Sequence, residues 1–141
     1  MSLKLCFMAV AFVIFAIFSC ADHITESRDA GNGPGQSGKK APASVQAIFD
    51  QSCALSGCHR DFQRPFLTAD VAYDNIVGAP STQSPSLNFI EPGDPSRSYL
   101  YLKITGGSGI IGTRMPQANP PLPAAQIDTI RVWIENGAPS E

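Results

Sequence analysis

Two cysteines and a histidine lie within seven residues of one another: Cys53, Cys58 and His59, with Gly57 directly before the second cysteine. This run constrains the chain more than any other feature, because two thiols and an imidazole so close together can share one bound group. One such group is haem, to which two thiols attach by thioether bonds while the adjacent imidazole binds the iron. Four residues separate the cysteines here, whereas the common attachment motif has two. The spacing therefore permits haem attachment without requiring it.

The same residues allow two other interpretations. A disulfide between Cys53 and Cys58, with His59 at the surface, suits an exported protein, because disulfides persist outside the cytosol. A zinc site fits less well, because zinc takes four ligands in paired spacing and the second histidine, His23, lies in a polar segment near the start. The choice between haem and disulfide must come from other parts of the chain.

The first segment predicts export. Lys4 precedes an unbroken apolar run over residues 5–18. The run has the length of a signal-peptide core and is shorter than the roughly 20 apolar residues of a membrane-spanning helix. We therefore expect a signal peptide over residues 1–19.

The end of that segment predicts a lipid anchor. Residues 17–20 resemble the bacterial lipobox, in which a cysteine becomes lipidated after cleavage, although Phe18 is bulkier than the residue usually found there. Lipidation of Cys20 would tether the protein to a membrane on the periplasmic side of the cell envelope, and Ala21 favours the outer membrane. The alternative is ordinary cleavage near Ser19 or Ala21.

Residues 20–42 predict a flexible tether. The stretch 30–38 is rich in Gly, Pro and Ser and has no apolar period, so it cannot bury a core. A flexible segment of about 20 residues has an r.m.s. reach of roughly 25 Å. The remaining residues, 43–141, predict one small domain.

Helical signals dominate that domain. Helices are expected over residues 44–53 with Ser44 as N-cap, from about Thr68, from an Asp94 cap and Pro95 to the glycines at 106–107, and from about Pro123 to Gly137. No alternating run predicts a sheet, so the fold class is mainly α with long loops. The formal net charge is −2 and no basic run occurs, which argues against a nucleic-acid partner.

Met115 lies in an irregular stretch ahead of the last predicted helix. A methionine on a loop usually fills a gap in the core, but its thioether is also a soft ligand, and a His/Met pair is one way in which proteins hold haem iron. Pro116 favours an extended backbone at Met115, which suits a rigid loop that presents a ligand.

Taken in order, these features resemble the small bacterial cytochromes c, among which the C-x4-C-H spacing is a known variant. The resemblance covers residues 45–138 and includes a P-G-D-P segment within residues 91–100. The matching residues near the C-terminus are Met115, Pro116, Pro121, Leu122, Ile127, Ile130, Trp133, Ile134, Gly137 and Ala138.

The resemblance implies a mainly α, cytochrome c-like domain of about four helices and long loops around one haem c. Cys53 and Cys58 would bind the haem covalently. His59 and Met115 would be the two axial iron ligands. Pro65, or a residue close to it, would offer a backbone carbonyl to the other ring nitrogen of His59.

The resemblance also implies that the first helix packs across the last, which would bring Phe49 near Ile130 and Trp133. The function it implies is electron transfer with a redox protein partner rather than enzyme catalysis. Two alternatives remain. If Met115 does not bind iron, the protein would be a five-coordinate haem sensor or enzyme subunit. If no haem is attached, it would be a disulfide-stapled lipoprotein binding module.

Overall fold

The computed structural model describes residues 37–117 and 119–141. The predicted signal peptide, Cys20 and the tether up to residue 36 lie outside the described residues. Among the residues described, no helix has the length and apolar character needed to cross a membrane.

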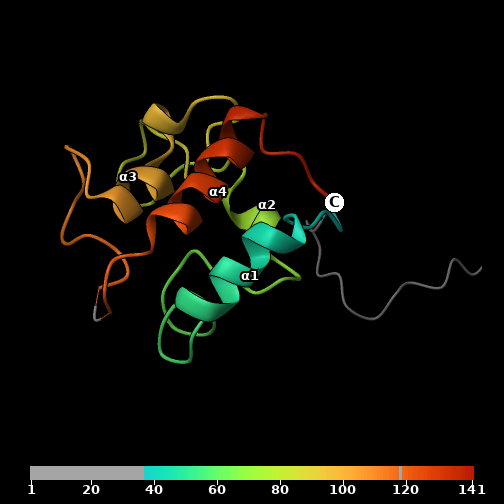
Figure 1. Cartoon of the computed structure of the whole chain (residues 1–141), viewed down its shortest axis with the longest axis horizontal. Helices are drawn as coiled ribbons and strands as arrows, with labels where there is room; N and C mark the ends of the chain where they lie inside the picture. Colours follow the sequence, from blue (N-terminus) through green and yellow to red (C-terminus); the bar gives the residue numbers. More distant parts are fainter. Residues whose placement is uncertain (1–36, 118) are drawn as a thin grey trace, which may run out of the picture. The chain divides into compact units, whose positions relative to one another are not determined.

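The described residues are mainly helical, as the sequence predicts (Figure 1). The elements in chain order are α1 (Ala43–Ser52), α2 (Ala72–Ile76), the 3-10 helix η1 (Pro95–Arg97), α3 (Tyr99–Thr105) and α4 (Ala124–Glu135). Strands are absent from this part of the chain, where the only β-type pairing consists of isolated bridges. Those bridges join the segment 77–80 to residues 88–90, and Asn88 to Ser98.

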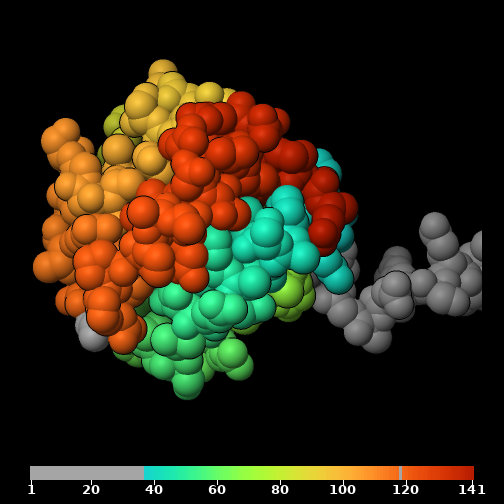
Figure 2. Space-filling view, in the orientation of Figure 1, coloured from blue at the N-terminus to red at the C-terminus, as the bar shows by residue number. Residues whose placement is uncertain are grey.

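α1 packs against α4, so the first and last helices lie side by side (Figures 1 and 2). Phe49 of α1 and Ile130 and Ile134 of α4 are fully buried. Burial of one such side chain contributes about 1.5–3 kcal/mol. The expected packing of the first helix on the last is therefore confirmed, and Trp133 lies in the same core with 5% of its surface exposed.

The start of α1 differs from the prediction. Ser44 lies inside the helix rather than at its N-cap, which is Pro42, and no side chain of the cap residue accepts a hydrogen bond. The carboxylate of Glu141 instead accepts a hydrogen bond from the Ala43 amide at 3.2 Å, across 98 positions of sequence. A distant residue thus satisfies one of the free N–H groups of the first turn.

The predicted helix after Asp94 is divided in two. Asp94 caps η1 as expected, because its carboxylate accepts from the amides of Ser96 and Arg97. Ser98 then adopts an extended conformation, with its hydroxyl donating to the Asp94 carbonyl at 2.8 Å. The Tyr99 amide donates to the Asn88 carbonyl at 2.9 Å, so a tertiary contact replaces a helical bond at the break. The prediction of one continuous helix was wrong here, although its end at Gly106, in the left-handed region, is confirmed.

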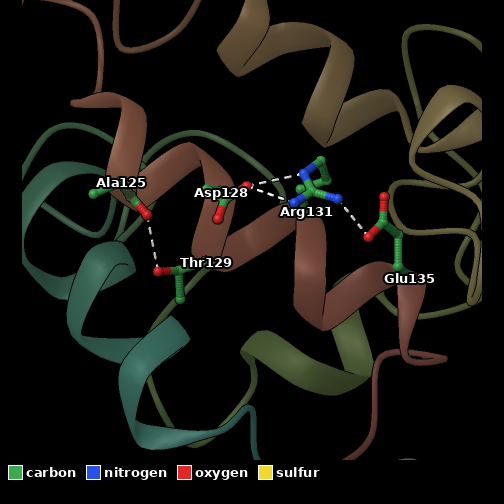
Figure 3. Close-up of polar contacts among 5 residues, drawn as sticks. All are labelled: Ala125, Asp128, Thr129, Arg131 and Glu135. Carbon is green, nitrogen blue, oxygen red and sulfur yellow. Dashed lines mark hydrogen bonds and ion pairs between the residues drawn. The ribbon is translucent and has the colours of Figure 1, made fainter.

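The last helix agrees with its prediction, since α4 follows Pro123 and ends one residue before Asn136. On its outer face Arg131 pairs with Asp128 and with Glu135, one turn away on either side (Figure 3). These contacts raise the pKa of Arg131 and keep its charge on the solvent side. The opposite side of the helix is free to pack against α1 and α3.

Candidate functional site

A cavity of about 870 Å³ opens between the loop after α1, helix α3 and the segment around Met115. Its volume falls within the roughly 300–1,000 Å³ range of small-molecule and cofactor sites. All four ligand residues predicted from the sequence line it: Cys53, Cys58, His59 and Met115. The fold thus brings Met115 to the same cavity as the cysteine loop, although the two lie far apart in the sequence.

The deeper walls of the cavity are apolar. They come from α1, α3, α4 and the loops between them: Phe49, Leu67, Phe89, Leu100, Ile104 and Ile130. Polar side chains line other parts of the surface, namely Thr82, Gln83, Lys103, Gln117 and Asn119. An apolar cavity with a few polar groups is the typical lining of a cofactor site.

The loop that carries the two cysteines is closed by short-range hydrogen bonds. Cys53 directly follows α1, and its amide donates to the Phe49 carbonyl at 2.8 Å. The His59 amide donates back to the Cys53 carbonyl at 3.2 Å. Gly57 has a φ of 75°, a left-handed conformation that glycine adopts without steric cost, and its amide donates to the Asp61 carboxylate at 2.8 Å. The wide spacing between the cysteines is therefore taken up by a tight turn.

The ring of His59 is oriented by backbone carbonyls. Its Nδ1 lies 2.9 Å from the Pro65 carbonyl oxygen and 3.1 Å from that of Gln63. Because carbonyl oxygens only accept hydrogen bonds, Nδ1 is the donor in these contacts, and in the neutral imidazole the lone pair is then on Nε2. The contact with Pro65 that the sequence predicts is present.

Within the described residues, Cys53 and Cys58 are free thiols, with Cys53 half-buried and Cys58 exposed. Burial, and secondarily the charge of Cys58, raises the pKa of Cys53 to about 11. Cys53 is therefore a neutral thiol near pH 7.

Met115 lines the cavity from a segment that lies far from the cysteine loop in the sequence. It is half-buried against the core, and its amide donates to the Lys103 carbonyl of α3 at 2.8 Å. Its peptide bond to Pro116 is cis, as is the one between Arg64 and Pro65.

Two residues that hold the Met115 segment were missed in the sequence, Tyr99 and Lys103. Lys103 is buried, with 7% of its surface exposed, and burial lowers the pKa of its ammonium group. The sequence contains one sign of an unusual position: Lys103 is a charged residue among the apolar residues of α3, one turn after Tyr99. A lysine at such a position is more often a solvated residue, so sequence alone did not distinguish it.

The mouth of the cavity is partly apolar. Phe62 lies at its edge with 71% of its surface exposed. Arg64 lines the same edge, and its guanidinium lies 4.8 Å from the centre of the Phe66 ring.

The residues present fit a covalently bound haem. Cys53, Cys58, His59 and Met115 all line one cavity, and its volume lies in the range of cofactor sites. In the part of the chain that the structure describes, there is no group of three or more His, Cys, Asp or Glu side chains that could hold a metal ion. Comparison with known proteins finds no family model, no curated protein and no solved structure that matches this chain.

Proposed function

We propose that this chain is a single-haem c-type cytochrome that transfers electrons in the cell envelope. The observation that carries the proposal is the convergence of Cys53, Cys58, His59 and Met115 on one largely apolar cavity. A lipid on Cys20 would keep the domain at a membrane surface, with the outer membrane favoured.

The two cysteines would form the covalent attachment. Their thiols would hold the haem through two thioether bonds to its vinyl groups. Cys53 retains its proton near pH 7 because burial raises its pKa, and Cys58 is exposed at the mouth. The two thiols would therefore hold the group at one half-buried and one exposed position.

His59 and Met115 would be the axial ligands. The Pro65 carbonyl holds the proton of His59 on Nδ1, which leaves Nε2 free to bind a metal. Met115, which lines the same cavity, would supply a soft thioether sulfur. A haem with both axial positions filled by protein supplies one-electron chemistry, and methionine ligation raises its potential.

Electrons would enter and leave at the mouth. Exposed Phe62 gives this edge an apolar contact surface beside Cys58. Redox partners usually meet over small, weak interfaces, so a docked redox protein is the expected partner.

The test is to express the full chain with a cytochrome c maturation system, purify it and record oxidised and dithionite-reduced spectra together with an intact mass. We expect a mass increase of one haem, sharp α and β bands on reduction, and the weak far-red band that methionine sulfur gives ferric haem.

The same experiment separates the alternatives. Attached haem without the far-red band, together with carbon monoxide binding in the ferrous state, would indicate the five-coordinate sensor or enzyme subunit. A colourless protein without free thiols at Cys53 and Cys58 would overturn the proposal and leave the disulfide-stapled binding module.

A further inference from the structure

Lys103 is a buried lysine whose ammonium group contacts backbone carbonyls of the Met115 segment. Its Nζ donates to the Thr113 carbonyl at 2.7 Å and to the Ile111 carbonyl at 2.9 Å. Lysines are almost never fully buried unless their charge is compensated. Here the partners are two carbonyls of one loop, and the ion pairs found among the described residues do not include Lys103.

Other groups of α3 hold the same loop. The Tyr99 hydroxyl, one turn before Lys103, accepts a hydrogen bond from the Ile111 amide at 2.9 Å and donates to Gln83 at 3.0 Å. The Lys103 carbonyl accepts from the Met115 amide at 2.8 Å. The Ile104 carbonyl accepts from Arg114 Nε at 2.7 Å. Apart from the bond to Gln83, each of these bonds joins α3 to the segment 111–115, so one helix fixes that segment from outside.

The segment has little means of holding its own shape. Gly109 and Gly112 both have positive φ values, 84° and 73°, and glycines lose more conformational freedom on ordering than other residues. The described hydrogen bonds of residues 111–115 go to α3 rather than to one another. The position of Met115 therefore depends on α3.

We propose that Lys103, assisted by Tyr99, is a positioning residue that holds the Met115 sulfur at the cavity. This inference rests on the proposed function, because it assumes that Met115 binds iron. Lys103 acts through the backbone of residues 111–113 and does not itself bind the metal. Loss of its ammonium group frees two carbonyls and lets the Met115 segment move away from the iron for part of the time.

The test compares Lys103→Leu with the wild type and with Lys40→Leu, a matched control at an exposed lysine. Leucine removes the charge and, unlike methionine, brings no second thioether into the cavity that Lys103 lines. In Lys103→Leu we expect covalent haem to be retained, the far-red band to weaken, and imidazole to bind ferric iron about 10-fold faster, a factor that corresponds to ~1.4 kcal/mol. Lys40→Leu is expected to match the wild type in all three.

Amide hydrogen exchange gives a readout that does not depend on iron. The amides of Ile111 and Met115 are expected to exchange about 10-fold faster in Lys103→Leu, whereas those of His59 and Leu67, which bond within the cysteine loop, keep their rates. If exchange, band and imidazole binding all match the wild type while only the unfolding free energy falls, Lys103 is merely structural and the inference is wrong.

Two further outcomes have a different meaning. Wild-type protein with attached haem but without the far-red band would overturn the Met115 ligation itself, and the inference with it. If Lys103→Leu does not fold, Tyr99→Phe serves instead, because it keeps the ring and removes only the hydroxyl that holds the Ile111 amide. Unchanged exchange at Ile111 and an unchanged band in Tyr99→Phe would then overturn the inference.

Discussion

The two loops that supply the candidate ligands are held in opposite ways. Between residues 53 and 65 the hydrogen bonds are short-range: the Gly57 amide bonds to Asp61, the His59 ring bonds to the Pro65 carbonyl, and Arg60 Nε bonds to the Ala54 carbonyl. Between residues 111 and 115 the bonds go to α3. The first loop therefore owes its shape to its own sequence and the second to a neighbouring helix. We expect substitutions in the first loop to act locally, and those in α3 to act at a distance on Met115.

The largest effect is expected from the cysteines themselves. Cys53→Ser together with Cys58→Ser removes both thiols, so the mass increase of one haem should disappear and the visible absorption of purified protein should fall to background. Ser56→Ala, an exposed change in the same loop, is the control and should keep both signals. Intact mass and absorption spectra make the comparison, and a coloured double variant with bound haem mass would contradict the covalent assignment.

Met115→Leu is expected to distinguish the contribution of the Met115 loop from that of the cysteine loop. Haem should stay attached through the first loop, while the far-red band disappears and the reduction potential falls on the order of 0.1 V, within the roughly 0.8 V range that axial ligands span. Leu122→Met, a swap at a buried residue further along the chain, should change the stability by less than about 1.5 kcal/mol and leave the potential unchanged. A Met115→Leu protein with an unaltered potential would show that Met115 is not a ligand.

Gly57→Ala tests the cysteine loop, which is held by short-range hydrogen bonds. A Cβ at this position meets nothing within 4 Å, so the cost comes from the left-handed φ alone and amounts to about 1–2 kcal/mol. Gly78→Ala is the matched control, because Gly78 also has a positive φ and open space around it. Both variants should lose similar stability in urea unfolding, but only Gly57→Ala should lower the yield of attached haem. Equal yields would mean that the turn at Gly57 does not position the thiols.

The smallest effect is expected at Asp94, which caps the 3-10 helix ahead of α3. Hydrogen bonds from Ser96, together with the Arg97 amide and charge, lower the pKa of Asp94 below its usual 3.8. Because the unfolded chain binds more protons between the two pKa values, this contribution is fully present above about pH 5 and is lost as the pH falls through the folded-state pKa. Urea unfolding of Asp94→Asn should therefore show a stability deficit at pH 7 that vanishes on acidification. A pH-independent deficit would contradict the electrostatic origin.

The same contrast explains what the sequence could reveal. The candidate ligands at residues 53–59 and the Pro65 contact were predictable because every partner lies within a few positions. Helix α4 was predictable from its apolar spacing and from the flanking Pro123 and Gly137. The role of Met115 as a ligand was predicted from its thioether chemistry and stays a prediction, whereas its contact with Lys103 was not predicted, since that contact exists only after the fold forms.

Two other differences have the same cause. Ser44 had the right residue type for a cap, but Glu141 takes the Ala43 amide from the far end of the sequence. The helix after Asp94 breaks at Ser98 because the next amide, that of Tyr99, bonds to Asn88. Local preferences were correct in type in each case and were overridden by a tertiary hydrogen bond.

Helix α1 sets the distance between Cys53 and the residues at the other end of the helix. Residues 37–42 lie against the domain rather than apart from it: Ser37 bonds to Asp74, and the Lys40 carbonyl accepts from the Glu141 amide at 2.9 Å. Cys53 follows the opposite end of the ten-residue helix, which spans about 15 Å. Glu141 bonds to Lys40 and Ala43 at the start of α1, so a fluorophore, an electrode linker or a fused domain joined at residue 141 would start about one helix length from Cys53, at a separation set by a rigid element.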